Sequence, residues 1–492
     1  MAKYISIDLG AESGRIIVAS LTGERLDLEE VYRFPNDVVQ VGDSLYWDVL
    51  HLWREIKIGL HKAAALHRGE ICSLAVDTWG IDFALLDRRG NLAGNPHAYR
   101  DPRTAGMMEA AVEKVGRWEI YRQSGGIQFM SINTLYQLYA MVQTGDPVLE
   151  IADTLLMIPD LFGYWLTGEL KCEFTDATST QFYDGQARSW SRPLLEALGI
   201  PTHILPEVIL PGTRLGTLLP ALAEESGLGQ LPVIAVAGHD TASAVVAVPA
   251  VEESEDWAWL SSGTWSLLGG ISTEPLVTEQ ALRFNFSSYG GPGGLYLPWK
   301  NIMGLWLVQE CRRSWDRQGH SYSYDELIAM ARGARPFAAV IDPDDASFLA
   351  PADMPQAIAE YCRKTGQTPP HEHGETVRCV LESLALRYRW VLERLALLQG
   401  CRFGALHIVG GGSRNGLLCQ FSADSLDLPV TAGPVEATSI GNAALQAVAM
   451  GDLGSLAEAR GLVRSACEVQ LYRPGDRCDW DEAYGRFQGL VG

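Results

Sequence analysis

The sequence predicts an α/β protein built from two domains of similar architecture, and three observations support this prediction. The chain has 492 residues, which is too many for one ordinary hydrophobic core. A strand, a glycine-containing turn and a second strand occur at 3–21 and again at 257–270, which we interpret as an internal duplication of architecture. The acidic stretch 251–257 has the composition of an exposed connection, so we place the two domains at 1–248 and 249–492.

In the first half of the chain, apolar runs predict strands and a helical period of apolar residues predicts helices. The expected elements, in order, are strands at 3–9 and 15–21, a helix within 46–67, two strands within 71–87, helices within 104–200, and strands near 231–238 and 244–248. A strand, a turn and a helix would fit the run 231–251 equally well. His239 and Asp240 at its centre argue against a membrane span.

In the second half, the segment 376–400 is the clearest helix, because its apolar residues keep to one face. Gly400 is well placed to end this helix. The segment 405–415 has the pattern of a strand, three glycines and the start of a helix. We expect a solvated polar loop at 369–375, because His371 and His373 lack a third metal ligand at the usual zinc spacing.

The composition indicates which classes of partner are excluded. The net charge of −21 argues against nucleic acid or an anionic membrane as the main partner, since both need a basic face. A small anionic ligand stays compatible with this charge, because a few local donors can hold it. The nine cysteines form no CxxC pair and the N-terminal residues have no signal-peptide pattern, so we expect a reduced, cytoplasmic protein. That compartment opposes a disulfide between Cys362 and Cys379, whose pairing is otherwise conceivable.

The first glycine-containing turn, DLGAESGR at 8–15, is a candidate anion site. A turn rich in Gly and Ser lets backbone N–H groups approach an anion closely, and Ser13 and Arg15 add donors. Asp8 lies at the end of a strand and could hold a hydrated Mg²⁺ ion. An ordinary hairpin turn would explain this stretch equally well.

Two further glycine-containing turns could lie against a nucleotide. The three glycines in VGGGSRN (409–415) would let a phosphate or a flat ring contact the backbone, and Thr264 is at the tip of SSGTWS (261–266). Plain turns are an equally good reading of both stretches. The chain has neither a GxxxxGK[ST] phosphate loop nor a Rossmann GxGxxG fingerprint at 409–415.

Asp240 in GHDTAS (238–243) is a carboxylate within a very apolar segment. Such a group is costly to bury unless it is paired, hydrogen-bonded or used in chemistry. It is placed like a general base at the end of a strand. It could instead cap the helix that follows, and the residues alone do not separate these two readings.

The order of these motifs resembles that of the actin-like ATPase superfamily, which includes sugar kinases, heat-shock chaperones and actin. Within it the chain resembles the FGGY carbohydrate kinases over its whole length, and 433–447 is similar to their late C-terminal motif. The resemblance implies two actin-like, ribonuclease H-like α/β domains, each with a mixed five-stranded sheet, on either side of a cleft. A chaperone-like switch would need a separate client-binding domain, for which the chain has no spare segment.

Six stretches resemble the members of this family that phosphorylate L-rhamnulose, namely 77–87, 98–104, 126–138, 238–245, 260–267 and 300–310. The resemblance implies transfer of a phosphoryl group from ATP, with Mg²⁺, to the 1-hydroxyl of L-rhamnulose in L-rhamnose breakdown. A kinase for another ketose or polyol, such as fuculose or xylulose, is the alternative. Ala11 and Glu12 depart from the two hydroxyl residues usual in related kinases, so phosphate contacts there rest on the backbone and Ser13.

The resemblance also implies roles for individual residues. Asp240 would be the proton acceptor, and Asp8 would position Mg²⁺ through water. The residues expected to line the ketose site are Gly80, His239, Thr241 and Asn301. Those expected to hold ATP are Ala11, Glu12, Ser13, Gly14, Arg15, Thr264, Gln309 and Gly411. The sugar is expected mainly on the first domain and the nucleotide mainly on the second.

Overall fold

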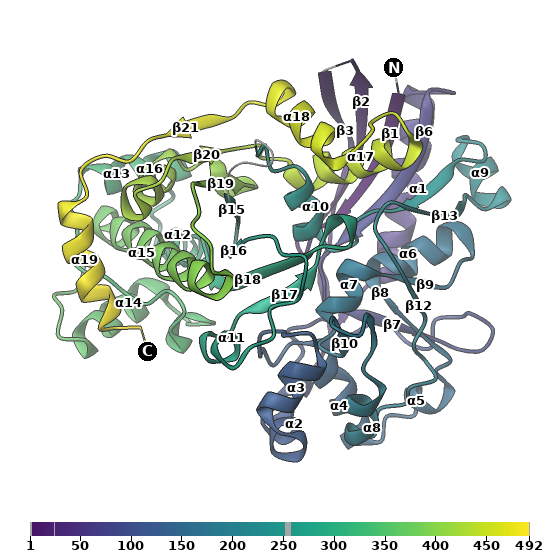
Figure 1. Ribbon diagram of the computed structural model, residues 1–492, viewed down its shortest axis with the longest axis horizontal. Coiled ribbons are helices and arrows are strands. Elements are labelled where there is room, and N and C mark those ends of the chain that lie inside the picture. Colours follow the sequence, from purple (N-terminus) through teal and green to yellow (C-terminus); the bar gives the residue numbers. More distant parts are fainter. Residues whose placement is uncertain (1, 24, 251–256, 492) are drawn as a thin grey trace. The chain divides into compact units, whose positions relative to one another are not determined.

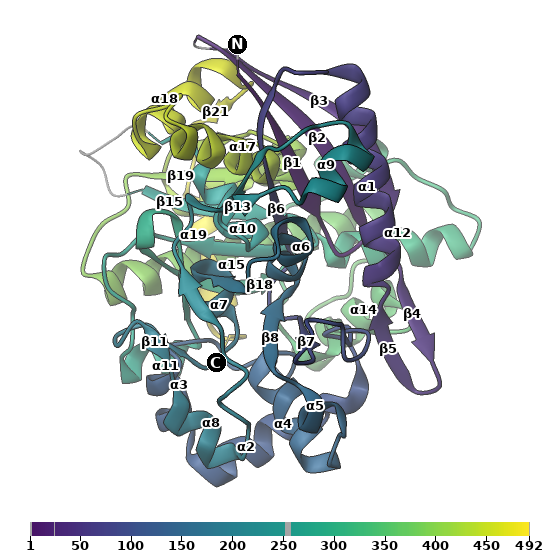
Figure 2. The same ribbon diagram turned by 90° about the vertical axis from the view of Figure 1, so that its right-hand side faces the viewer.

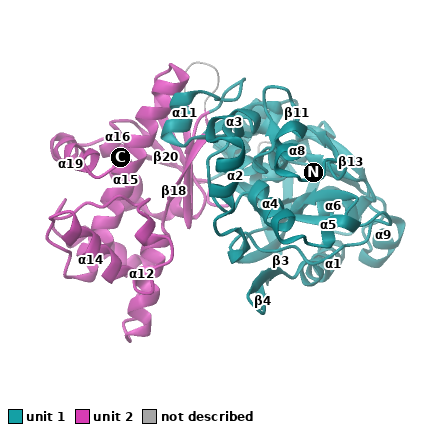
Figure 3. Cartoon of the chain, turned by 90° about the horizontal axis from the view of Figure 1, so that it is seen from below, with its two compact units in different colours: residues 1–248, 271–298, 437–467 teal, residues 249–270, 299–436, 468–492 magenta. Residues whose placement is uncertain are grey.

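The computed structural model describes residues 2–23, 25–250 and 257–491, so most of the predicted connection at 251–257 lies outside the described residues. The chain forms two compact units, coloured separately in Figure 3. Unit 1 comprises Met1–Val248, Ile271–Pro298 and Ala437–Cys467. Unit 2 comprises Pro249–Gly270, Trp299–Glu436 and Glu468–Gly492. Two segments that the sequence assigned to the second domain, 271–298 and 437–467, therefore belong to unit 1.

The main sheet of unit 1 has six strands in the order β13-β14-β6-β1-β2-β3. Their bounds are β1 Ala2–Leu9, β2 Ser13–Thr22, β3 Arg25–Pro35, β6 Ile71–Thr78, β13 Thr213–Thr217 and β14 Pro232–Ala235. The predicted hairpin of β1 and β2 is confirmed, and β6 runs parallel to β1 with Asp77 opposite Asp8. The expected count of five strands was wrong. The antiparallel edge strand β13 is short and has no buried residue, so it carries no apolar pattern.

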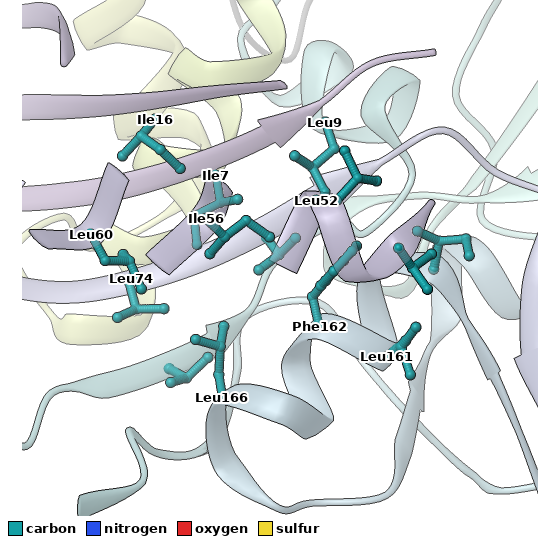
Figure 4. Packing of buried hydrophobic residues seen from close by; sticks show 14 of the residues in the cluster. Ile7, Leu9, Ile16, Leu52, Ile56, Leu60, Leu74, Leu161, Phe162 and Leu166 are labelled. Atoms are coloured by element: carbon teal, nitrogen blue, oxygen red, sulfur yellow. The ribbon is translucent and has the colours of Figure 1, made fainter. Parts of the chain in front are cut away.

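Each face of this sheet is covered by helices. In β1 the apolar side chains of Ile5, Ile7 and Leu9 point to one face, while Ser6 and Asp8 point to the other, because successive residues of a strand alternate. The apolar face packs against α1 (Val49–Leu66) and α6 (Ile158–Thr167), and Figure 4 shows this core. The opposite face lies against α17 (Ala437–Met450), as Figures 1 and 2 show.

The region expected to be rich in helices, 104–200, contains α2 to α8 and confirms that prediction. The remaining elements of unit 1 are β4 Val38–Val41, β5 Ser44–Trp47, β7 Phe83–Leu86, η1 Pro102–Thr104, α2 Met107–Val115, α3 Arg117–Gln123, α4 Thr134–Thr144, α5 Val148–Ile151, β8 Thr154–Met157, β9 Lys171–Glu173, α7 Phe174–Ser179, β10 Tyr183–Asp184, β11 Ser189–Trp190, α8 Arg192–Leu198, β12 Glu207–Ile209, α9 Pro220–Ser226, α10 Asp240–Val246, α11 Glu279–Phe284, β17 Ser287–Gly290, η2 Pro292–Gly294 and α18 Leu456–Ala466.

The predicted strand at 244–248 was wrong, because most of this stretch belongs to helix α10. A short apolar run fits a buried strand and a buried helix equally well, so its composition alone could not decide. The alternative of a strand, a turn and a helix is the correct one. The strand is β14, and the turn carries Gly238 and His239.

In unit 2, the strands β18-β16-β15-β19-β20-β21, in this order, make up six of the seven strands of a mixed sheet. The elements are β15 Trp257–Ser262, β16 Trp265–Gly269, β18 Tyr296–Met303, α12 Trp306–Arg317, α13 Tyr324–Gly333, η3 Ala346–Phe348, α14 Met354–Lys364, α15 His373–Gln399, β19 Ala405–Val409, η4 Gly411–Arg414, α16 Gly416–Leu426, β20 Val430–Ala432, β21 Gln470–Tyr472 and α19 Cys478–Gln488. The predicted hairpin of β15 and β16 is confirmed, and β19 runs parallel to β15. Five strands were again too few, because the short exposed β21 adds an antiparallel edge.

Helix α15 confirms the strongest helix prediction and ends at Gly400, whose φ of 66° is left-handed. It begins earlier than expected, at His373, so the polar loop is shorter than predicted. His373 stacks on Trp315 at 4.3 Å between ring centroids, and its Nδ1 lies 3.1 Å from the Tyr322 hydroxyl. Among the described residues, no group of three or more His, Cys, Asp and Glu side chains could hold a metal ion.

All nine cysteines are free thiols in the structure, including Cys362 and Cys379. Within the described ranges no helix combines the length and apolar character that a membrane crossing requires.

Candidate functional site

Asp8 is buried near the end of β1, with 4 % of its surface exposed. Its Oδ2 accepts hydrogen bonds from Arg15 Nη2 at 2.5 Å and from Ser439 Oγ at 2.7 Å. Burial raises the pKa of Asp8, while the Arg15 guanidinium and the Ser439 hydroxyl lower it. Two of the residues named from the sequence, Asp8 and Arg15, are therefore in direct contact.

The turn between β1 and β2 is closed by backbone bonds. Gly10 N donates to Ser13 O at 2.9 Å, and Asn36 donates to the carbonyl oxygens of Gly10 and Glu12. Gly14 lies directly under the Phe34 ring, which leaves no room for a side chain. Packing against Phe34 therefore explains why residue 14 is a glycine.

Asp77 lies at the end of β6 and is completely buried opposite Asp8. Its Oδ2 accepts a hydrogen bond from Asn442 Nδ2 at 2.5 Å, and its Oδ1 has no hydrogen-bond partner within the described part of the chain. Burial and then the neighbouring Asp8 carboxylate raise the pKa of Asp77 well above its usual range. Asp77 is not among the site residues predicted from the sequence, although it lies near the end of a strand that is predicted to be buried.

Helix α17 supplies the polar partners of both carboxylates. Besides Ser439 and Asn442, Gln446 Nε2 donates to Asn442 Oδ1 at 2.7 Å and to Ile5 O at 2.9 Å. Its Oε1 accepts from Ser73 Oγ at 2.7 Å. These α17 side chains are fully buried, so they form one hydrogen-bonded row between the helix and strands β1 and β6.

Asp240 is the first residue of α10, and its side chain is partly exposed at 36 %. Its Oδ1 lies 2.9 Å from His239 Nδ1 and accepts hydrogen bonds from Thr241 N at 2.5 Å and Thr241 Oγ1 at 3.2 Å. The structure places His239, not Asp240, at the N-cap position. Asp240 Oδ1 nevertheless accepts from an amide in the first turn of α10, so the structure leaves both the capping role and the general-base role open, and the side chain is exposed on one side.

The backbone just before Asp240 is held by two side chains of unit 1 that the sequence analysis missed. Glu173 Oε2 accepts from Gly238 N at 2.8 Å, and Thr175 Oγ1 accepts from His239 N at 3.1 Å. Burial raises the pKa of Glu173 to about 7, against the hydrogen bonds that lower it. No local sequence signal marks these two residues, because the contact joins positions far apart in the chain.

Gly80 lies beside His239. A Cβ atom at Gly80 would come within 2.7 Å of His239 Cδ2 and 3.3 Å of Asp176 Oδ1, so only glycine fits. Thr78 N donates to Gly238 O at 2.8 Å and so joins the end of β6 to the turn before α10. The structure thus brings together Gly80, His239, Asp240 and Thr241, all named from the sequence.

In unit 2, Thr264 and Gln309 are in contact, because Thr264 Oγ1 donates to Gln309 Oε1 at 3.2 Å. The Thr264 carbonyl oxygen accepts from Trp306 N at 3.1 Å, which joins the hairpin tip to the start of α12. Asn301 lies on β18 opposite Leu267. A Cβ atom at Gly411 would meet no described atom within 4 Å, whereas one at Gly412 would overlap Ser262 Oγ.

Known proteins share both the sequence and the fold of this chain. The models of the FGGY family of carbohydrate kinases match residues 3–247 with the N-terminal domain and 258–450 with the C-terminal domain. A rhamnulokinase from Bacteroides thetaiotaomicron is 45% identical over 490 residues, which cover 99% of each chain. A rhamnulokinase from Pectobacterium carotovorum subsp. carotovorum is 42% identical over 491 residues, covering 99% of this chain and 96% of the relative.

Two solved structures illustrate the fold. The ligand-bound xylulose kinase from Lactobacillus acidophilus has a TM-score of 0.83 at 16% identity, covering 100% of this chain and 97% of that one. Plasmodium falciparum glycerol kinase with ADP has a TM-score of 0.80, also at 16% identity, covering 100% of this chain and 98% of that one. At this identity the likeness concerns the fold alone.

Proposed function

Because the chain belongs to the FGGY family of carbohydrate kinases, we propose that it transfers the γ-phosphoryl group of ATP to the 1-hydroxyl of L-rhamnulose. The products would be L-rhamnulose 1-phosphate and ADP, a step of L-rhamnose breakdown. The observation that carries the substrate assignment is the similarity to rhamnulokinases, which extends over nearly the whole chain at 45% and 42% identity. The cytoplasmic location expected from the sequence stays a prediction.

Asp240 is the proposed proton acceptor. The contacts with His239 and Thr241 all use its Oδ1, so we expect Oδ2 to take the proton from the 1-hydroxyl as that oxygen attacks the γ-phosphorus. His239, Thr241 and Gly80 would contact the ketose, and the backbone bonds from Glu173 and Thr175 hold the loop before Asp240. The role of Asn301 in sugar binding stays a prediction.

The proposed cofactors are ATP and Mg²⁺. Asp8 and Asp77 fit a cation, because carboxylate oxygens are the ligands that Mg²⁺ prefers and Asp77 Oδ1 has no other described partner. When bound, Mg²⁺ would neutralise charge on the phosphoryl oxygens. Ser13 and the backbone N–H groups at 11–15 would add donors to the phosphates. The assignments of Thr264, Gln309 and Gly411 to ATP stay predictions.

The experiment is a sugar panel with ADP release as the readout, in the presence of ATP and Mg²⁺. We expect L-rhamnulose to have the highest kcat/KM among L-rhamnulose, L-fuculose, D-xylulose and glycerol. A clear preference for one of the other three would reject the substrate assignment and leave the membership of the kinase family unchanged. Omitting the sugar serves as the control, because a kinase releases little ADP without its acceptor.

A further inference from the structure

The turn that carries Gly80 has an unusual backbone. It joins β6 to β7, and Ile81 within it has a φ of 68°. The left-handed region is unfavourable for a β-branched residue, so this conformation persists only where the surroundings impose it. Because the turn also places Gly80 against His239, its shape determines the wall beside the proposed ketose site.

Three hydrogen bonds impose the conformation of Ile81. Ile81 N donates to Ser179 Oγ at 3.1 Å, and Ile81 O accepts from Thr134 Oγ1 at 2.6 Å. Gln137 Nε2 also approaches Ile81 O, at 3.4 Å. The donors and the acceptor come from α4 and α7, so two helices hold the peptide groups on both sides of Ile81.

The next residue, Asp82, is a buried carboxylate on which three separate segments converge. Its Oδ2 accepts from Trp47 Nε1 at 2.6 Å, Trp79 Nε1 at 2.9 Å and Tyr99 N at 3.2 Å. Its Oδ1 accepts from Gln137 Nε2 at 2.9 Å. The stretches 77–87, 98–104 and 126–138, which the sequence analysis singled out separately, therefore meet at this one side chain.

Stability alone does not account for this arrangement. A carboxylate is costly to bury, and apolar side chains of similar size fill a core at lower cost. A buried carboxylate that receives hydrogen bonds from several segments instead fixes the relative positions of those segments. Trp79, two residues after Asp77, is one of its donors, and Gln137 is shared between Asp82 and Ile81.

We propose that Asp82 is a positioning residue for sugar recognition, which together with Thr134 and Gln137 holds the Gly80 turn against His239. By this means it determines which ketose fits beside His239. The proposal rests on the proposed function, in which Gly80 and His239 contact the sugar. Asp82 itself is completely buried and does not touch the substrate.

The test compares two variants with a matched control. Asp82→Asn replaces the carboxylate with a group that cannot accept all four hydrogen bonds, and Thr134→Val removes only the 2.6 Å bond to Ile81 O while keeping the side-chain shape. Asp87→Asn is the control, because Asp87 follows β7 at its other end and accepts its bonds from within the turn 87–91. For each variant, KM for the ketose, KM for ATP and the melting temperature are measured.

We expect KM for the ketose to rise ~10-fold or more in Asp82→Asn and ~3-fold or more in Thr134→Val, with KM for ATP within about twofold. The ratio of kcat/KM for L-rhamnulose to kcat/KM for L-fuculose should fall in both variants. Asp87→Asn should match the wild type. An unchanged ketose KM in a folded Asp82→Asn or Thr134→Val variant, or an equal rise in both KM values, would overturn the proposal.

Failure of this proposal is distinct from failure of the proposed substrate. If the wild type prefers another ketose, the same KM comparison is made with that ketose, and the role of Asp82 is decided independently. If Asp82→Asn does not fold, Thr134→Val and Ser179→Ala decide, since each removes one contact with Ile81 and leaves the Asp82 carboxylate in place.

Discussion

The sheets of the two units share their strand order and strand directions, yet their central strands end in different chemistry. In unit 1, the parallel strands β1 and β6 place Asp8 opposite Asp77. In unit 2, the corresponding strands β15 and β19 place Ser261 opposite Val409. The duplicated architecture thus supplies the same frame twice. The residues at the strand ends decide whether that frame presents buried carboxyl groups or small neutral groups.

The supporting contacts differ in the same way. The two carboxylates of unit 1 accept hydrogen bonds from Ser439 and Asn442, because a buried charge without partners is costly. In unit 2, a buried hydroxyl pair joins Ser266 and Tyr388 at 2.8 Å, with no charge involved. Unit 1 therefore buries two neighbouring carboxyl groups and supplies each with a polar partner from α17.

The largest effect is expected from Asp240→Asn, which removes the basic carboxylate at position 240 in unit 1. A positioned general base contributes on the order of 10²–10⁴-fold, so kcat should fall by that factor, about 3–5 kcal/mol in barrier. KM for the sugar should change little, since the amide occupies the same place. Stability should hold, because His239 is the capping residue and the amide oxygen can still accept from Thr241 N. Measuring kcat and melting temperature on one preparation checks this, and near-normal turnover by a stable variant would remove Asp240 from the mechanism.

Smaller effects are expected from two variants that remove a buried hydrogen bond, one to a carboxylate in unit 1 and one between hydroxyl groups in unit 2. Asn442→Ala removes the donor to a buried carboxylate and should lower the free energy of unfolding by about 2–3 kcal/mol. Tyr388→Phe removes a neutral hydroxyl contact in unit 2 and should cost about 1 kcal/mol. Urea unfolding of both variants and the wild type measures the difference. Equal losses would show that charge does not distinguish the two units.

The smallest effect is expected from Gly411→Val in unit 2. The position is open, so the variant should fold normally, while the added side chain blocks close approach by the nucleotide. KM for ATP should rise about tenfold, near 1.4 kcal/mol, with KM for the sugar nearly unchanged. Gly412→Val is the contrasting variant, because its side chain would overlap Ser262 Oγ and should lower the melting temperature instead. Unchanged ATP affinity in a folded Gly411→Val protein would place the nucleotide elsewhere.

Much of the fold could be predicted from the sequence because its hairpins and long helix have strong local signals. Apolar strands flank glycine turns in both hairpins, and α15 keeps an apolar face over its length up to Gly400. The edge strands β13 and β21 were missed because they are short and have no buried residue. The long edge strand β3 was missed as well, since only Leu26 and Phe34 among its residues are buried. Helix α10 was partly taken for a strand because a short run of Ala and Val suits either structure.

The candidate site was predictable only where a reactive side chain stands beside a turn signal. Asp8 and Asp240 met that condition, and the structure places both in unit 1. Asp77 did not, because only the pairing of β6 with β1 brings it opposite Asp8. Asn442 and Glu173 act through contacts with residues hundreds or tens of positions away in the chain, and no local pattern encodes such a contact.

The placement of α17 in unit 1 also bears on how the protein is made. Strands β1 and β6 leave the ribosome early, whereas Ser439 and Asn442 follow hundreds of residues later. Until then Asp8 and Asp77 lack the helix that later buries them, so unit 1 cannot complete its polar row during most of translation. Domains usually fold as units during synthesis, starting from the N-terminus. In this chain the burial of Asp8 and Asp77 beneath Ser439 and Asn442 must instead wait until one of the last helices has been synthesised.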